Sequence, residues 1–311
     1  MHVAIYLPLI FAAVLGATAT QLSRTLPPAT AARLLTAAGV VTAAATSFVL
    51  AVLAFTLLAE LAPVAELGSW STSALDAVNP VPDGTSAVAV AAVCLLGMIA
   101  VRVAMLRVRA ARAARRLCAQ LGGGPGDLVV VDGPEIEVFA VPARRGRIVA
   151  TRPLLAALPA DERRAVLAHE TAHLRHHHHR YRLAAELAAA VNPLLRPMAG
   201  AVEYATERWA DEVAAGIVGD RRVVARALAR CGLEATQPRR PAPWAAAALH
   251  ATKPSRLVRR VEALLAPAPR RRPLLVAGVA VLLVVTMAAV VETQRDTEQM
   301  FETASVGVLG G

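Results

Sequence analysis

Four long apolar stretches with almost no charge dominate the hydrophobic pattern of this chain. They cover about residues 3–21, 34–61, 86–106 and 273–291. Each is close to or above the roughly 20 residues that a helix needs to cross a bilayer. The first has no basic segment before it, and further apolar stretches follow, so we interpret it as a retained helix rather than a signal peptide. The pattern therefore predicts four transmembrane helices.

Between the third and fourth stretches the pattern changes to shorter runs. A glycine-rich run at 122–126 is interpreted as a linker. Runs rich in β-branched residues lie at 128–131, 136–141 and 147–151. Because turn residues separate them, they predict a small antiparallel sheet. Helical patterns follow at 153–158, 161–190 and 200–217. The fold class predicted is an α-helical membrane protein with four transmembrane helices plus a mainly helical α+β domain.

Arginine placement orients the apolar stretches. Arginines lie in the first loop, at the end of the third stretch and before the fourth: Arg24, Arg33, Arg102, Arg107, Arg109, Arg112, Arg115, Arg116, Arg270, Arg271 and Arg272. The loop at 62–85 and the tail at 292–311 are mainly acidic instead. By the positive-inside rule, both termini are predicted outside and residues 117–272 in the cytoplasm. Residues 1–116 would then hold three membrane helices, and the short extracytoplasmic tail is expected to be disordered.

The composition supports this interpretation. Of 311 residues, 56% are hydrophobic and 18% charged, and the mean hydropathy is +0.50, which is unusual for a soluble protein. The net charge of +10 would suit a nucleic-acid partner, but aromatic residues are scarce and the basic residues adjoin the apolar stretches. We therefore expect a lipid bilayer and no direct nucleic-acid contact. The three scattered cysteines predict no disulfide framework.

The most specific motif is HExxH, formed by His169, Glu170 and His173 within the helical run at 161–190. Residues four apart share one face of a helix, so the two imidazoles point to one place. Zinc commonly binds two imidazoles and a carboxylate. Glu170 adjoins the first imidazole, where a general base would be needed. The motif predicts a metal site with Glu170 as its catalytic residue.

A third ligand is expected from the helix at 200–217. Glu207 and Asp211 form an ExxxD pattern and lie one turn apart on one face. Glu207 would complete the site for one zinc ion per chain, with Glu203 as the rival ligand. Asp211 would accept the second N–H of a ligand imidazole, or else be a solvated acid.

Four consecutive histidines, His176 to His179, also suggest metal binding. On one continuous helix they point in four directions and cannot converge on one ion. Only His177 would lie one turn beyond His173. A polar, partly exposed helix turn is the favoured interpretation.

Residues 163–173 resemble the active-site helix of membrane-bound gluzincin peptidases, and residues 207–211 resemble their downstream glutamate motif. The BlaR/MecR signal-transducing peptidases share the predicted layout, with a zinc domain between the third and fourth of four membrane helices. This chain has only about 20 residues after the fourth helix and no Ser-x-x-Lys, so their penicillin-binding sensor domain has no counterpart. The resemblance implies a zincin-like fold for the predicted cytoplasmic domain.

The HtpX/CAAX-prenyl-protease group has similar motifs. Thr252-Lys253-Pro254-Ser255 with Arg259 resembles its Thr-His-Pro-Ser motif and following arginine, but Lys253 replaces the histidine. Arg259 would contact substrate or lie on a helix surface; both alternatives stay open. In zinc peptidases an exposed strand commonly pairs with extended substrate. The strand at 147–151 would take that role, or be an ordinary interior strand.

The sequence therefore predicts an integral-membrane zinc endopeptidase that acts on the cytoplasmic side. The BlaR/MecR resemblance implies a protein substrate such as a cytoplasmic repressor, and the HtpX resemblance implies quality control of membrane proteins. A non-enzymatic signalling or scaffold protein with a structural metal site is the third alternative. Such a site would need a fourth protein ligand, for which His177 is the weak candidate.

Overall fold

The computed structural model describes all residues except 1–3, 121–127, 134–136, 144–145, 236–253 and 310–311. The predicted linker at 122–126 lies outside the described residues. Each apolar stretch lies in a long helix: α1 (Leu7–Thr25), α2 (Pro28–Ala59), α5 (Asp83–Gln120) and α12 (Pro273–Leu309). By length and composition, these helices are able to cross a membrane.

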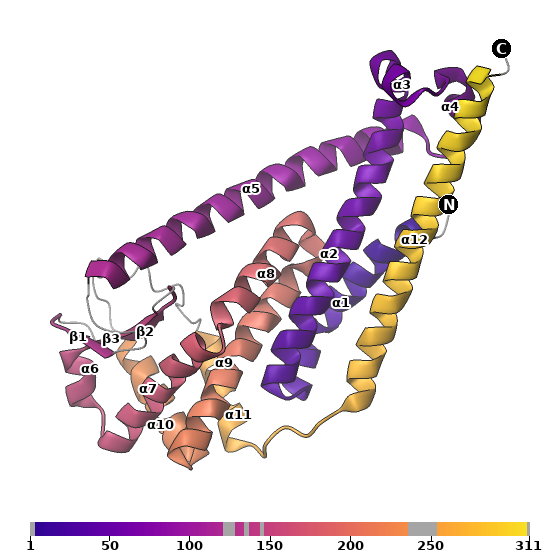
Figure 1. Ribbon diagram of the computed structural model, residues 1–311. Helices are drawn as coiled ribbons and strands as arrows, with labels where there is room; N and C mark the ends of the chain where they lie inside the picture. Colours follow the sequence, from indigo (N-terminus) through magenta and orange to yellow (C-terminus); the bar gives the residue numbers. More distant parts are fainter. Residues whose placement is uncertain (1–3, 121–127, 134–136, 144–145, 236–253, 310–311) are drawn as a thin grey trace.

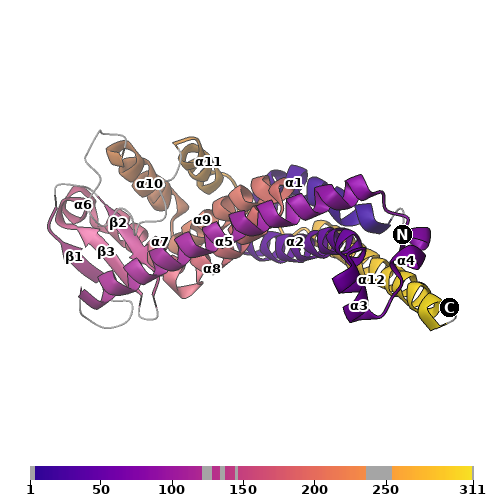
Figure 2. The same cartoon turned by 90° about the horizontal axis from the view of Figure 1, so that it is seen from above.

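The long helices give the molecule an elongated shape with a folded region at one end (Figure 1). Helices α1, α2 and α12 lie side by side, whereas α5 leaves α2 and slants toward the sheet (Figures 1 and 2). The start of α5 is attached to α2 by a buried hydrogen bond between the Thr56 and Ser86 hydroxyls, 2.9 Å apart. Its end packs on the sheet, where Ala114 and Cys118 share a core with Phe139.

At the opposite end, the loop after α2 forms two short helices, α3 (Ala62–Gly68) and α4 (Thr72–Val78). Helix α4 packs against the last part of α12, where Met300 and Ala304 are buried. The Ser71 N–H donates to the Ala304 carbonyl at 3.2 Å. The prediction of a disordered tail is therefore wrong for its described part, because these contacts support a continuous helix through Leu309.

The sheet is mixed rather than antiparallel. Strands β1 (Leu128–Val131), β2 (Val138–Val141) and β3 (Arg147–Thr151) lie in the order β1-β3-β2. β3 pairs in parallel with β1 and antiparallel with β2. The prediction of an antiparallel sheet is wrong for β1. This strand pairs with β3, which inserts between β1 and β2 and runs parallel to β1. β3 is buried along its whole length and paired at both edges, so it is the interior strand and cannot pair with a substrate.

The predicted helix over 161–190 is interrupted. Helix α6 (Arg152–Ala157) leads into α7 (Ala160–Arg175), and α8 (His178–Val191) follows after a turn. His177 has a left-handed backbone with φ of 52°. This turn redirects the chain, so that α8 packs along α2 and α5 instead of continuing α7. The prediction of one continuous helix is wrong at this point.

Helix α8, the short η2 (Pro193–Leu195) and α9 (Arg196–Val218) form a hairpin that packs among the long apolar helices (Figure 1). Near its tip the Asn192 amide donates to the Thr46 hydroxyl of α2 at 3.2 Å. Met198 lies against Gly39, where a side chain on residue 39 would clash. The hairpin thus shares its core with α1 and α2. Helices α10 (Arg221–Ala235) and α11 (Pro254–Leu265) complete the region next to α7 and α9.

Candidate metal centre

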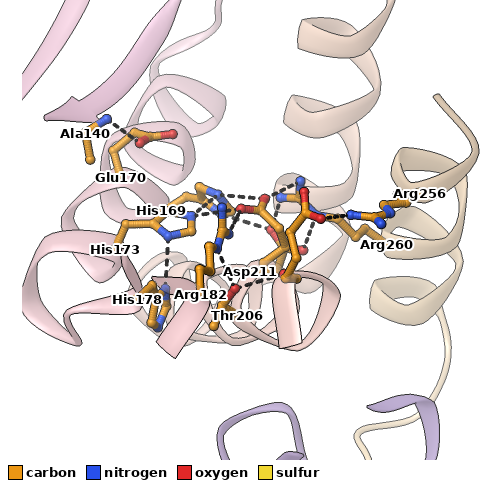
Figure 3. Close-up of polar contacts among 12 residues, drawn as sticks. Ala140, His169, Glu170, His173, His178, Arg182, Thr206, Asp211, Arg256 and Arg260 are labelled. Atoms are coloured by element: carbon orange, nitrogen blue, oxygen red, sulfur yellow. Dashed lines mark hydrogen bonds and ion pairs between the residues drawn. The ribbon is translucent and has the colours of Figure 1, made fainter. Parts of the chain in front are cut away.

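Helix α7 presents its histidines to α9 because its apolar face is packed there. Asp161 and Glu162 lie in its first turn, where negative charge is favourable next to the helix N-terminus. Ala165 and Ala172 are almost fully buried. This packing directs His169 and His173 toward α9 (Figure 3). There they meet Glu207; His169 and Glu207 are buried and His173 is partly buried.

The side chains of these three residues converge. His169 Nε2 lies 3.1 Å from His173 Nε2. Glu207 Oε2 lies 3.6 Å from His169 Nε2, and Glu207 Oε1 lies 3.3 Å from His173 Nε2. Two ligands bound at about 2.05 Å with a tetrahedral angle lie about 3.3 Å apart. The spacing and the donor set therefore fit a tetrahedral zinc site with three protein ligands.

Each candidate ligand imidazole also has a buried partner at its other nitrogen. Asp211 Oδ1 lies 2.9 Å from His169 Nδ1, as expected for the hypothesis that Asp211 orients a ligand. His178 Nδ1 lies 3.0 Å from His173 Nδ1. Burial lowers the pKa of His178 to about 2, so this ring stays neutral. The expectation for His177 is wrong, because the turn at this residue brings His178 to the site instead.

Two buried arginines complete the site, and the sequence reasoning missed both. Arg260 of α11 donates to both Asp211 oxygens, at 2.7 and 2.8 Å (Figure 3). It also lies 2.6 Å from the Glu207 carboxylate. Arg182 of α8 donates to Glu207 and, at 2.9 Å, to the Thr206 hydroxyl. Burial alone would raise the pKa of Glu207, but the nearby positive charges, Arg260 first, hold it well below its usual value.

The other candidates from the sequence lie outside this cluster. Glu203 pairs with Arg256, so the rival ligand is not at the centre. Arg259 is exposed on α11, a position compatible with either of its two alternatives. Lys253 lies outside the described residues.

Glu170 lies beside the three ligands and faces the sheet. One of its carboxylate oxygens accepts a hydrogen bond of 2.7 Å from the Ala140 N–H of β2. Burial raises the pKa of Glu170 to about 7, and the charge of Glu207 adds to the increase, while His169 and the Ala140 N–H oppose it. A carboxyl group with a pKa near neutrality is suited to accept and return a proton.

Comparison with known proteins identifies one family. The model of peptidase family M48 matches residues 106–268, more than half of the chain. The matched segment contains the HExxH motif, Glu207, Asp211 and both site arginines. M48 peptidases are zinc-dependent, and the cluster of His169, His173 and Glu207 is able to hold a metal. Neither the curated proteins nor the solved structures that were searched contain a match.

Proposed function

The chain belongs to peptidase family M48 as a membrane-associated gluzincin metallopeptidase, and we propose that it is an integral-membrane zinc endopeptidase. The convergence of His169, His173 and Glu207, with Glu170 beside them, is the observation that carries this proposal. These three residues would hold one zinc ion. Bound zinc supplies a Lewis acid that polarises the scissile carbonyl and makes water more acidic.

Glu170 is the proton carrier of the proposed reaction. It would accept the proton of the attacking water and deliver it to the nitrogen of the departing peptide. Its hydrogen bond to the Ala140 N–H keeps the carboxylate at the sheet side of the site. On the other side of the site, Asp211 contacts the ligand His169, and Arg260 pairs with Asp211.

The edge of the sheet next to the site is β2, and we propose that it binds the substrate backbone. The Ala140 N–H points away from β3, since it donates to Glu170. An extended peptide could add along this outer edge as a further strand, with its backbone close to Glu170, if it took over the Ala140 N–H from the Glu170 carboxylate. This role replaces the one considered for β3.

The proposed sidedness follows from the arginines. The turn between α1 and α2 lies at the same end of the helices as the site, because the Arg208 guanidinium donates to the Ser23 carbonyl at 3.1 Å. Arg24 and Arg33 flank that turn, so the positive-inside rule assigns this end to the cytoplasm. Both termini would then lie outside. Protease protection of a C-terminal tag in oriented vesicles tests this arrangement.

The proposed substrate is a cytoplasmic protein, such as a transcriptional repressor in a BlaR/MecR-like pair. Support comes from the order of three long apolar helices before the site and one after it. The second candidate is HtpX-like quality control of membrane proteins. The observation that favours it is the α8–α9 hairpin, which places Glu207 on a helix packed directly against α1 and α2.

A structural metal site in a non-enzymatic protein is the weaker alternative. Among the described residues, the group that converges consists of three metal ligands. A structural zinc site normally has four, whereas a catalytic site keeps one position open. Glu170, half-buried beside the ligands, also has no role in a closed site.

Comparing the native protein with Glu170→Gln tests the proposed function. Both proteins are purified in mild detergent, and zinc content and cleavage of an unstructured protein are measured. We expect about one zinc per chain in each protein and cleavage by the native protein alone. If the native protein retains no zinc, or holds zinc and does not cleave, the proposal is wrong.

A further inference from the structure

Trp209 joins the candidate metal centre to the first two long helices. It is 7% exposed and lies on α9 between Glu207 and Asp211. The Arg33 guanidinium of α2 lies over its ring, 4.8 Å from the ring centroid. The His178 ring contacts it at 4.8 Å between centroids. One indole therefore contacts both an apolar helix and a residue of the site.

His178 in turn contacts His173. Its side chain is 1% exposed, and the two Nδ1 atoms lie 3.0 Å apart (Figure 3). If His173 binds metal through Nε2, its proton is on Nδ1, and this N–H donates to His178 Nδ1. Asp211 has the same relation to His169, at 2.9 Å. His178 is thus the acceptor next to His173, as Asp211 is the acceptor next to His169.

Packing rather than hydrogen bonding holds the far side of His178. Its buried Nε2 has no hydrogen-bond partner among the described residues. Trp209 covers the ring, and His176 stacks on the same indole at 4.8 Å with an interplanar angle of 29°. The position of His178 therefore depends on Trp209.

A second contact fixes the same turn of α9 to the membrane helices. Arg208, next to Trp209, donates to the carbonyls of Ser23 and Arg24 at 3.1 and 3.3 Å. These carbonyls lie in the last turn of α1, where helix carbonyls lack partners within the helix. Two adjacent residues of α9 thus connect the metal-binding segment to the α1–α2 hairpin.

We propose that His178 is a positioning residue for the metal ligand His173, and that Trp209 and Arg33 hold His178 in place. The apolar helix α2 is then part of the metal centre, and its placement affects metal affinity. This inference rests on the zinc site of the proposed function.

The test uses the full chain in detergent, with zinc affinity measured by chelator competition and site geometry by the absorption spectrum of the cobalt-substituted protein. His178→Ala is expected to weaken zinc binding about 10- to 100-fold and to change the cobalt spectrum. His178→Asp restores an acceptor and should recover most of the affinity. Arg33→Gln is expected to weaken zinc binding roughly 2- to 5-fold, from loss of the cation–π contact.

Arg24→Gln is the matched control. Arg24 is exposed and lies near the same turn, so its loss changes the local charge equally and should leave zinc affinity within about twofold. The inference is overturned by one combination of results: the native protein binds zinc, and both His178→Ala and Arg33→Gln have the zinc affinity and the cobalt spectrum of the native protein. If His178→Ala does not fold, Arg33→Gln and His178→Asp decide. Absence of zinc binding by the native protein would instead overturn the proposed function itself.

Discussion

Removing the Arg260 guanidinium should destabilise the metal-free protein strongly. Arg260 is 4% exposed and is the charge partner of both Asp211 and Glu207, with contacts of 2.6 to 2.8 Å. Arg260→Met keeps much of the side-chain volume but leaves two buried carboxylates without this cation. Breaking a buried ion pair by removing one partner costs about 3–5 kcal/mol of unfolding free energy.

The assay is thermal unfolding in detergent after chelation of metal. At about 2–4 °C per kcal/mol, the midpoint for Arg260→Met should fall by roughly 6–20 °C. Saturating zinc should restore part of the loss, because a bound dication compensates the Glu207 carboxylate and stabilises the folded state by mass action.

Arg259→Met provides the matched control. Arg259 is the preceding residue of α11 and is exposed. Its replacement removes the same charge from the chain and should change the unfolding free energy by no more than about 0.5 kcal/mol. Equal midpoints for the two variants would refute the argument that Arg260 neutralises buried carboxylates.

Three further predictions concern zinc affinity, each measured by chelator competition. Glu207→Gln should weaken zinc binding at least about 100-fold, whereas Glu203→Gln, one turn earlier on α9, should stay within about twofold; equal losses would contradict the ligand assignment. Asp211→Asn should cost about 10- to 100-fold, and native affinity in this variant would exclude an orienting role. Burial would lower the pKa of His169, but Asp211 and Glu207 outweigh it and raise the pKa to about 9. Zinc must displace this proton, so the affinity for zinc should rise about tenfold per pH unit from pH 7 to 9. A zinc affinity that does not change over this range would contradict the raised pKa of His169.

The parts of the structure that depend on local spacing could be predicted from the sequence. The four long helices follow from apolar composition, and the convergence of His169 with His173 follows from their separation by one helical turn. The ExxxD pattern similarly predicted that Glu207 and Asp211 share a face of α9. Asp211 lies against His169, as hypothesised.

The parts that depend on packing between distant segments could not be predicted in this way. Arg182 and Arg260 reach the site because α8 and α11 pack on α9, and no local pattern distinguishes Arg260 from Arg259. The order of the sheet depends on β3 inserting between β1 and β2, which pairing of neighbouring strands does not indicate. The turn at His177 interrupts a run whose residue preferences favour a helix.

One missed feature did have a signal in the sequence. Residues 292–305 contain neither proline nor glycine. This composition allows the last apolar helix to continue beyond the apolar stretch at 273–291. The contacts of Met300 and Ala304 with the α4 region then stabilise the extension.

We propose that this site hydrolyses peptide bonds with zinc bound and with Glu170 as proton carrier. The most direct measurement is mass spectrometry of the products of an unstructured protein incubated in ¹⁸O-labelled water. The native protein is compared after zinc removal and after zinc return, with Glu170→Gln as control. We predict new C-termini that carry ¹⁸O with zinc-loaded native protein alone. Cleavage of equal extent by Glu170→Gln, or none by zinc-loaded native protein, would contradict the claim.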